Sequence, residues 1–309
     1  MIMKTLKLLF ATMLIGISFT SCSVVIDDIN DSYYVNLEDV VTAYDLWYVD
    51  YNSTTGTGDV PFLSKAFTVS FINGKLWVNN NLVGIGAVGN GYGIEIGYYD
   101  TYKGILEIDH NLDGYYDFDV VQLTSDRLKL IDNYNNVSYY LEGYQKYNFD
   151  YDQIFYDNIE YFLQEYNVWE KTYTSMVGDL NEFDNENFLS FTPENITTFY
   201  SSQDEIGTDI ANIYWDYVGD YSVANVQGYE NLKILTLDYD SWGNEEFELT
   251  VINDTKISLY HINSGTTYEF SGRGYIQYLK SSSSKVTVRN EGRKRTKVIR
   301  ETKIRRNLK

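Results

Sequence analysis

The chain has little of the chemistry that cross-linked or metal-binding folds need. Cys22 is its only cysteine, so no disulfide can form within one chain. The two histidines, His110 and His261, have no cysteine or second histidine at ligand spacing, so a zinc site or a histidine-based catalytic triad has no support. Stability must therefore come from apolar cores.

Long apolar runs are also absent. No stretch reaches the roughly 20 apolar residues that a membrane-spanning helix needs. The most apolar run, residues 8–17, follows Lys4 and Lys7 and precedes the cleavage-site-like segment Phe19–Cys22. This order is typical of a secretory signal peptide, which we assign to residues 1–21.

Cys22 stands where bacterial lipoproteins carry their lipidated cysteine, so the N-terminal segment resembles a lipoprotein signal. The resemblance implies that Cys22 is lipidated. Residues 22–35 would then tether the mature chain to the outer membrane, on the cell surface or the periplasmic face. Phe19 replaces the leucine that such signals usually carry three residues before the cysteine. The alternative is an ordinary secretory signal followed by an incidental cysteine.

Basic residues are scarce outside the C-terminal segment. Residues 285–309 hold eleven Lys or Arg and two Glu, which gives +9. With +2 from Lys4 and Lys7 and a total of −20, residues 22–280 carry −31. So acidic a body repels polyanions, and no nucleic acid is expected as its partner. Residues 281–309 have too few apolar residues for a core and are predicted to be a basic, disordered tail.

The chain is built twice. Residues 106–147 return in register as residues 235–278, and the shared positions are mainly apolar and alternating rather than catalytic. The equivalent pairs include Leu106 and Leu235, Phe118 and Phe247, Leu128 and Ile257, Tyr139 and Tyr268, and Gly143 and Gly272. The duplication predicts two domains, residues 36–150 and 151–280, each with strands whose alternate residues face a core.

A short helix and a tryptophan precede the strands of each copy. In the first copy Asn36 is the predicted N-cap. Apolar residues at helical spacing follow it and predict a helix that ends before Trp47. In the second copy Asp157 is the predicted N-cap, and the same spacing leads to Trp169. We therefore expect equivalent helices at the start of both domains.

Beyond each helix the apolar period shortens to two residues. Gly, Asn and Asp mark turns between about eight short strands in each copy. Eight antiparallel strands are enough to close a small sheet into a barrel. The sequence predicts an all-β fold of two tandem small antiparallel β-barrels, each preceded by a short helix. Two-sheet β-sandwiches are the alternative.

This succession of a short helix, a tryptophan on the first strand and a meander of hairpins resembles the lipocalin-like domains of Gram-negative surface lipoproteins. Asp45 and Asn167 stand where the lipocalin signature has a glycine, two residues before the tryptophan. The resemblance implies two cup-shaped barrels that bind something small and apolar. A shared fold does not by itself transfer a function.

The sharpest local motif consists of Asp109, Asn111, Asp113 and Asp117. Oxygen ligands at alternate positions before a glycine match the start of an EF-hand-type loop, so these four residues are candidate calcium ligands. The loop lacks the closing glutamate, because Val120 occupies its twelfth position, and no helix flanks it. A β-hairpin with an Asp-Gly bend and solvated acids is therefore the favoured interpretation, and calcium binding is the alternative.

Two further features carry weaker hypotheses. Gly84–Gly89 has the spacing of a dinucleotide-binding loop, but no helical stretch follows it, so a glycine-rich hairpin or bulge is the better interpretation. Tyrosine is abundant, and the pairs Tyr98-Tyr99 and Tyr115-Tyr116 must place one ring on each face of a sheet. An exposed aromatic face beside acids could stack on sugars.

No residue set in the sequence has a catalytic signature. We therefore predict a non-enzymatic, surface-anchored lipoprotein that acts as a binding or envelope interaction module, with calcium as its one candidate cofactor. The expected partners are the outer membrane, through the lipid anchor, and a small apolar ligand or an envelope glycan. The alternative is a carbohydrate-binding or carbohydrate-active surface protein that uses Asp, Glu and exposed Tyr side chains.

Overall fold

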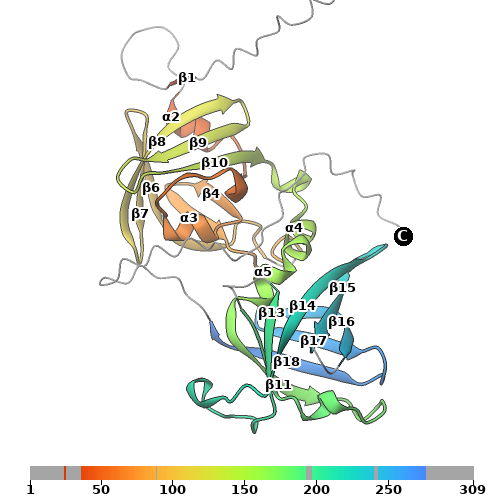
Figure 1. The fold of residues 1–309 in the computed structure, drawn as a ribbon. Helices are drawn as coiled ribbons and strands as arrows, with labels where there is room; N and C mark the ends of the chain where they lie inside the picture. Colours follow the sequence, from red (N-terminus) through yellow and green to blue (C-terminus); the bar gives the residue numbers. More distant parts are fainter. Residues whose placement is uncertain (1–23, 26–35, 88, 193–196, 240–242, 276–309) are drawn as a thin grey trace, which may run out of the picture.

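The computed structural model describes residues 24–25, 36–87, 89–192, 197–239 and 243–275. They form two tandem closed antiparallel β-barrels of eight strands each, accompanied by short helices, as the sequence predicts (Figure 1). Closure of both sheets excludes the β-sandwich alternative. Cys22 and the basic tail lie outside the described residues, so the lipidation of Cys22 stays a prediction.

The first barrel closes through its last strands. Its eight strands are β2 (Leu46–Val49), β4 (Thr68–Ile72), β5 (Lys75–Asn79), β6 (Ile94–Tyr102), β7 (Ile105–His110), β8 (Gly114–Thr124), β9 (Arg127–Asp132) and β10 (Val137–Tyr144). They pair in the order β8-β7-β6-β5-β4-β2-β10, and β9 pairs with both β10 and β8. Two short strands pair antiparallel with this barrel: β1 (Val24–Val25) with β8, and β3 (Thr55–Gly56) with β10.

The second barrel is a simpler meander. Its strands are β11 (Tyr166–Thr174), β12 (Phe188–Phe191), β13 (Thr198–Ser202), β14 (Tyr217–Val226), β15 (Tyr229–Asp238), β16 (Asn244–Asn253), β17 (Lys256–His261) and β18 (Thr267–Tyr275). Each strand pairs with the next, and β18 returns to β11. The predicted repeat is therefore a repeat of whole barrels.

The helix before the first barrel forms as the sequence predicts. Helix α2 (Leu37–Val41) begins after Asn36, whose side-chain oxygen accepts the N–H of Glu38 at 3.2 Å. Its apolar residues are buried against the barrel core. A polar N-cap and apolar residues at helical spacing are therefore sufficient to fix a helix of little more than one turn.

The helix before the second barrel differs from the prediction. Two helices are present, α4 (Tyr151–Asp157) and α5 (Ile159–Leu163). The prediction that Asp157 is an N-cap is wrong, because Asp157 ends α4. The N-cap of α4 is Asp150, whose carboxylate accepts the N–H of Gln153 at 2.9 Å. The buried side chain of Asn158 donates to the carbonyl of Ile154 at 2.8 Å and marks the break between the helices.

Each barrel carries the same closing unit of tryptophan, tyrosine and glycine, which we call the Trp–Tyr–Gly unit. In the first barrel, Nε1 of Trp47 donates to the carbonyl of Val41 at the end of α2, at 2.7 Å. The ring of Tyr44 meets Trp47 edge-on, with centroids 5.1 Å apart. The same ring packs on Gly143 in β10, where a Cβ would lie 2.5 Å from Cγ.

The second copy has the same unit with the same kinds of contact. Nε1 of Trp169 donates to the carbonyl of Leu163 at the end of α5, at 2.8 Å. Tyr166 meets Trp169 edge-on at 4.9 Å and packs on Gly272. The equivalence of Gly143 and Gly272 that the sequence reveals thus has a steric cause, since any side chain at either position would enter an aromatic ring.

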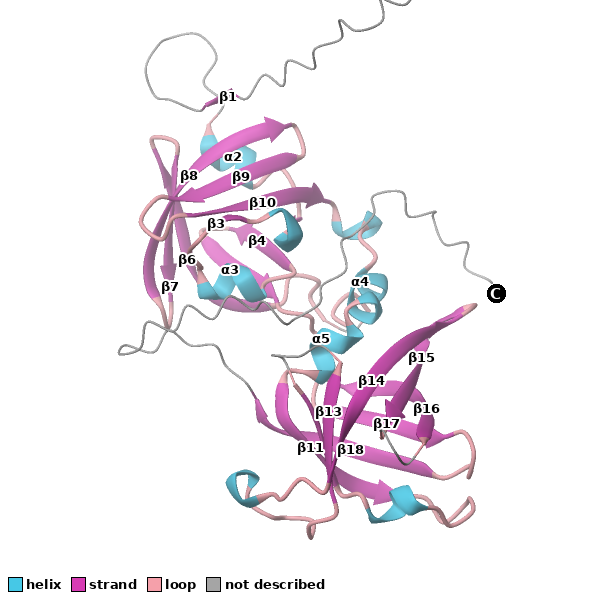
Figure 2. Cartoon of the chain, in the orientation of Figure 1, coloured by secondary structure: helices cyan, strands magenta, loops and turns pink. Residues whose placement is uncertain are grey.

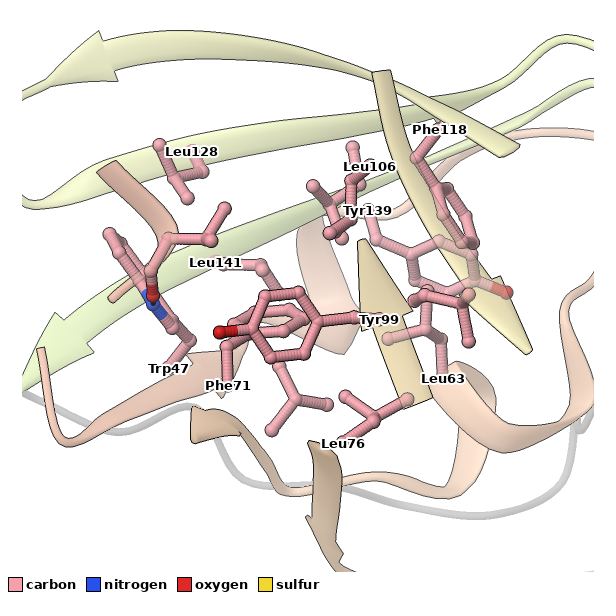
Figure 3. Packing of buried hydrophobic residues seen from close by; sticks show 14 of the residues in the cluster. Trp47, Leu63, Phe71, Leu76, Tyr99, Leu106, Phe118, Leu128, Tyr139 and Leu141 are labelled. Carbon is pink, nitrogen blue, oxygen red and sulfur yellow. Dashed lines mark hydrogen bonds between the residues drawn. The ribbon is translucent and has the colours of Figure 1, made fainter. Parts of the chain in front are cut away.

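The interior of the first barrel is occupied by side chains (Figure 3). Those labelled in the figure are at most 6% exposed, and they are Trp47, Leu63, Phe71, Leu76, Tyr99, Leu106, Phe118, Leu128, Tyr139 and Leu141. Leu63 belongs to helix α3 (Pro61–Lys65), and the N–H of Val60 just before this helix donates to Oη of Tyr139 at 2.8 Å. An eight-stranded barrel is narrow enough for side chains to fill it.

The second barrel is filled and closed in an equivalent way. The helical turn η3 (Glu182–Asn185) places Phe183 in the core with no exposed surface. Tyr268, the counterpart of Tyr139, donates from Oη to Oδ1 of Asp184 at 2.7 Å. Neither described core therefore has the apolar cup that the lipocalin resemblance implies.

The two barrels meet at a separate apolar cluster, which we call the junction cluster. Helices α4 and α5 lie between the barrels, as Figures 1 and 2 show. The buried members of this cluster are Leu46, Tyr48, Phe67, Ile85, Tyr144, Phe149, Tyr151, Ile154 and Tyr161. Tyr161 from α5 meets Phe67 of the first barrel edge-on, with centroids 5.3 Å apart.

Candidate functional site

A mainly apolar cavity lies between the barrels, and we call it the interbarrel pocket. Its volume is about 400 Å³, within the range of small-molecule sites. The first barrel supplies an apolar lining of Phe62, Val78, Leu82, Ile94, Ile96 and Leu112. Ile94 and Leu112 are 51% and 74% exposed, so the pocket presents an apolar surface to solvent.

The second barrel closes the pocket through polar contacts. The N–H of Val83 donates to Oδ1 of Asp254 at 2.8 Å, and Asn80 Nδ2 donates to Oη of Tyr275 at 3.0 Å. Tyr166 donates from Oη to the carbonyl of Asp254 at 2.9 Å. Burial raises the pKa of Asp254, although the bond from Val83 opposes the rise.

The loop after β5 carries a buried amide beside the pocket. Asn81 has a positive φ of 73°, a conformation that asparagine tolerates better than most residues. The side-chain oxygen of Asn79 accepts the N–H of Leu82 at 2.9 Å and so holds the loop. Asn81 is only 2% exposed, and neither its Oδ1 nor its Nδ2 has a hydrogen-bond partner among the described residues.

His110 and Asp113 lie at the wall of the pocket. Nδ1 of His110 accepts the N–H groups of Leu112 at 3.2 Å and Asp113 at 3.0 Å, so this nitrogen carries no proton. Burial lowers the pKa of His110 in spite of the Asp113 carboxylate, 3.6 Å from Nδ1. The ring is thus neutral and stacks on Phe62, with centroids 5.4 Å apart. His110 and Asp113 are neighbours rather than an ion pair.

The candidate calcium ligands lie in the hairpin formed by β7 and β8, which also holds His110. Asp109 and Asp117 lie on β7 and β8 with exposed side chains, and Asn111 is exposed in the turn. The side chain of Asp113 is 6% exposed and faces His110 instead. Within the described ranges, no group of three or more His, Cys, Asp or Glu is arranged to hold a metal ion. The structure does not bring the four residues together around one point, and calcium binding stays a prediction.

A second, polar cavity lies at one end of the second barrel, and we call it the acidic cleft. Its volume is about 340 Å³, and three glutamates, Glu182, Glu186 and Glu245, line it together with Tyr217 and Tyr239. Its floor is built by η3 and by the ends of β14 to β16. This cleft places several titratable groups within one concave surface.

Glu186 is the most perturbed carboxyl of the acidic cleft. It is 5% exposed, and its Oε2 accepts hydrogen bonds from Oη of Tyr239, at 2.7 Å, and from Oγ of Ser201. Burial raises its pKa to about 7, and the negative charge of Glu245 acts in the same direction. Glu186 therefore holds its proton at pH values where an ordinary glutamate is ionised.

The other groups near the cleft are held by hydrogen bonds. His261 lies with Nε2 2.6 Å from Oε2 of Glu245 and Nδ1 2.7 Å from Oγ of Ser264. Lys171 is 4% exposed and donates from Nζ to the carbonyl of Asp184 at 2.6 Å. Burial lowers the pKa of Lys171. The cleft thus combines a buried carboxyl whose pKa is raised with a second glutamate, Glu245, that contacts the imidazole of His261.

The tyrosine pairs divide between the two faces of the sheet, as predicted. Tyr99 and Tyr116 are 6% and 4% exposed, whereas Tyr98 and Tyr115 are 53% and 82% exposed. Asp109 on β7 lies between Tyr98 on β6 and Tyr115 on β8 in the cross-strand register. This row is an exposed aromatic and acidic surface, and its stacking on sugars stays a prediction.

No protein-family model matches this chain, and no curated protein matches it in sequence. In the part of the chain that the structure covers, no helix has both the length and the apolar character to cross a membrane. The two cavities are therefore the features of the molecule from which a function can be inferred.

Sequence reasoning missed Asn81, Phe62 and Glu186. All three lie in or next to connections between strands, where apolar periodicity carries no information. Two consecutive asparagines after β5 are a signal for a turn, and this signal could have located Asn81. It could not have shown that the amide lacks partners, because that depends on contacts distant in the sequence.

Proposed function

We propose that this chain is a non-enzymatic binding protein of the bacterial envelope, and that the interbarrel pocket holds its small, largely apolar ligand. The observation that carries the proposal is the apolar lining of a cavity of about 400 Å³ between two barrels whose own cores are filled. Sites of this kind favour the boundaries between domains. Two copies of one fold thus create a site that neither copy has alone.

The experiment measures binding of N-phenyl-1-naphthylamine, a neutral apolar dye that fluoresces in apolar surroundings. Ile94→Lys places a charge in the pocket at a residue that is already 51% exposed, so the barrel should still fold. Ile252→Lys is the matched control, since Ile252 is 48% exposed on β16 and does not line the pocket. We expect the first variant to lose at least tenfold in affinity and the control to match the wild type. Equal binding by all three proteins would overturn the proposal.

The envelope location rests on the sequence around Cys22. Lipidation would anchor the mature chain to a membrane without a spanning helix. Cys22→Ser should therefore move the protein from the membrane fraction to the soluble fraction of expressing cells. Retention of the variant in the membrane fraction would contradict the lipid anchor.

The acidic cleft favours a second candidate function, a carbohydrate-active protein. Glycoside hydrolysis uses a pair of carboxyl groups, one of which has a raised pKa. The acidic cleft supplies Glu186, whose pKa burial raises to about 7, together with Glu245. A panel of aryl glycosides tests this alternative. The carbohydrate-active function would be supported if the wild type hydrolyses a glycoside, Glu186→Gln abolishes the hydrolysis and the control Glu246→Gln, at an exposed position, leaves it intact. No hydrolysis by the wild type would reject it.

A further inference from the structure

We propose that the ligand of the interbarrel pocket carries an uncharged carbonyl oxygen on its apolar body, and that Nε2–H of His110 donates a hydrogen bond to this oxygen. The inference rests on the proposed binding function of the pocket and adds the chemical class of the ligand. It is carried by a free donor on the pocket wall and by the way in which the second barrel fills the corresponding place.

The ring of His110 has one nitrogen engaged and one nitrogen free. Nδ1 accepts the N–H groups of Leu112 and Asp113, so the proton of the neutral ring is on Nε2. Nε2 makes no hydrogen bond to any described residue, and it is not one of the polar atoms that are fully buried without a partner. Because His110 is 8% exposed and lines the pocket, this donor is accessible from the pocket.

The surroundings of His110 hold its ring in place. The ring stacks on Phe62, with an angle of 21° between the two planes, and Phe62 is itself part of the pocket lining. The two backbone N–H groups hold the edge of the ring that carries Nδ1. A ring held in this way loses little freedom when a ligand binds, so its free donor is preorganised.

The second barrel has an acceptor at the corresponding place. The repeat that aligns Leu106 with Leu235 also aligns His110 with Tyr239. Tyr239 donates from Oη to Oε2 of Glu186 at 2.7 Å, and both residues line the acidic cleft. In the second barrel the chain thus supplies its own oxygen to the donor at this position.

The first barrel lacks an acceptor side chain at the position of Glu186. The tryptophans of the two Trp–Tyr–Gly units pair with Val69 and Leu189, so Ala66 and Glu186, three residues earlier, are equivalent. Ala66 offers a methyl group where Glu186 offers a carboxyl group. The free donor of His110 is therefore left for the oxygen of a ligand.

The charges of the lining favour an uncharged oxygen over a carboxylate. Oδ2 of Asp113 lies 3.6 Å from Nδ1 of His110, and Glu165 and Asp254 belong to the same lining. Lys65 is the one cationic side chain among the described residues that line the pocket. A carboxylate ligand at Nε2 would meet this excess of acidic groups, whereas the oxygen of a ketone or an ester would not.

The experiment compares two neutral ligands, butyrophenone and butylbenzene, which differ only in that a carbonyl group replaces a methylene group. At roughly 30 Å³ for each non-hydrogen atom, a cavity of about 400 Å³ holds roughly 13 atoms, so both ligands are of suitable size. Each is used to displace bound N-phenyl-1-naphthylamine from the full chain. Sodium 4-phenylbutanoate is the anionic counterpart, and stronger displacement by this salt than by butyrophenone would overturn the preference for an uncharged ligand.

A variant then assigns the carbonyl contact to His110. In His110→Asn the new Oδ1 can accept the N–H groups of the turn in place of Nδ1, but no donor remains at the position of Nε2. We expect the butyrophenone concentration needed for displacement to rise about tenfold relative to that of butylbenzene, because the carbonyl loses its donor. Equal changes for the two ligands in a folded variant would overturn the carbonyl inference and leave the binding function intact. Absence of dye binding in the wild type would instead overturn the proposed function, and the inference with it.

A measurement on the wild type keeps the inference testable if the variant fails to fold. The chain has only two histidines, so the imidazole N–H signals of a protein with ¹⁵N-labelled histidine are few. The Nε2–H signal of His110 should move downfield with butyrophenone and not with butylbenzene, because only the ketone accepts a hydrogen bond. The same response to both ligands would overturn the contact.

Discussion

Replacing Gly143 by alanine tests whether the Trp–Tyr–Gly unit holds the first barrel closed. The new Cβ would lie 2.5 Å from Cγ and 2.8 Å from Cε2 of Tyr44, whereas carbon atoms in contact prefer about 3.5–4.0 Å. Either the ring or strand β10 must therefore move by about 1 Å. The ring cannot slide freely, because it packs edge-on against Trp47, which has no exposed surface.

The expected loss follows from two opposing effects. Overpacking a filled core costs about 1–3 kcal/mol. Alanine also restricts the unfolded chain, which stabilises the fold by about 0.4–1 kcal/mol. Gly143 does not have a positive φ, so no backbone strain is added. We expect the free energy of unfolding of the first barrel to fall by about 1–2 kcal/mol.

Urea denaturation followed by tryptophan fluorescence provides the measurement. Gly272→Ala is the matched variant, since a Cβ there would lie 2.5 Å from Cδ2 and 2.6 Å from Cδ1 of Tyr166. In a Tyr44→Ala background, Gly143→Ala should cost less than about 0.5 kcal/mol, because the ring that it would strike is gone. Wild-type stability of Gly143→Ala, or additive losses in the double variant, would refute the steric role of the unit.

Two further predictions concern pH. Because burial holds the pKa of His110 below that of the unfolded chain, about 6.5, the first barrel should lose stability as the pH falls below that value. His110→Asn, which keeps an acceptor for the turn, should show a shallower decline in urea titrations; an identical slope would contradict the neutral-ring assignment. Because the pKa of Glu186 is raised from 4.5 to about 7, the second barrel should lose stability as the pH rises between these values. Glu186→Gln should remove this trend, and its persistence in the variant would assign the trend to another group.

The sequence was sufficient for the architecture because the architecture depends on periodic burial. The alternation of Tyr98 and Tyr99, and the equivalence of Trp47 and Trp169, follow from local patterns that every strand and helix must obey. The duplication strengthened these patterns, since chance rarely repeats a core in register. The prediction of two barrels with a helix before each therefore needed no knowledge of tertiary contacts.

The candidate site depends on contacts that no local pattern encodes. The interbarrel pocket is lined by both copies, which meet through contacts such as the hydrogen bond between Val83 and Asp254, 171 positions apart. The raised pKa of Glu186 depends on burial beneath Tyr239. The second N-cap was misplaced by one residue, because the helix predicted after Asp157 is α5, which begins after Asn158, and Asp157 ends the helix that precedes it.

The junction cluster determines where this chain can be cut. A division after residue 150, which the repeat suggests, would separate Tyr151, Ile154 and Tyr161 from the outer apolar surface of the first barrel. Leu46 and Phe67, now 0% and 1% exposed, would then face water and make an isolated first barrel prone to aggregation. A cut after residue 163 would instead expose Phe155, Ile159, Phe162 and Leu163 of these helices, which pack in the core of the second barrel, so the two barrels should be expressed together.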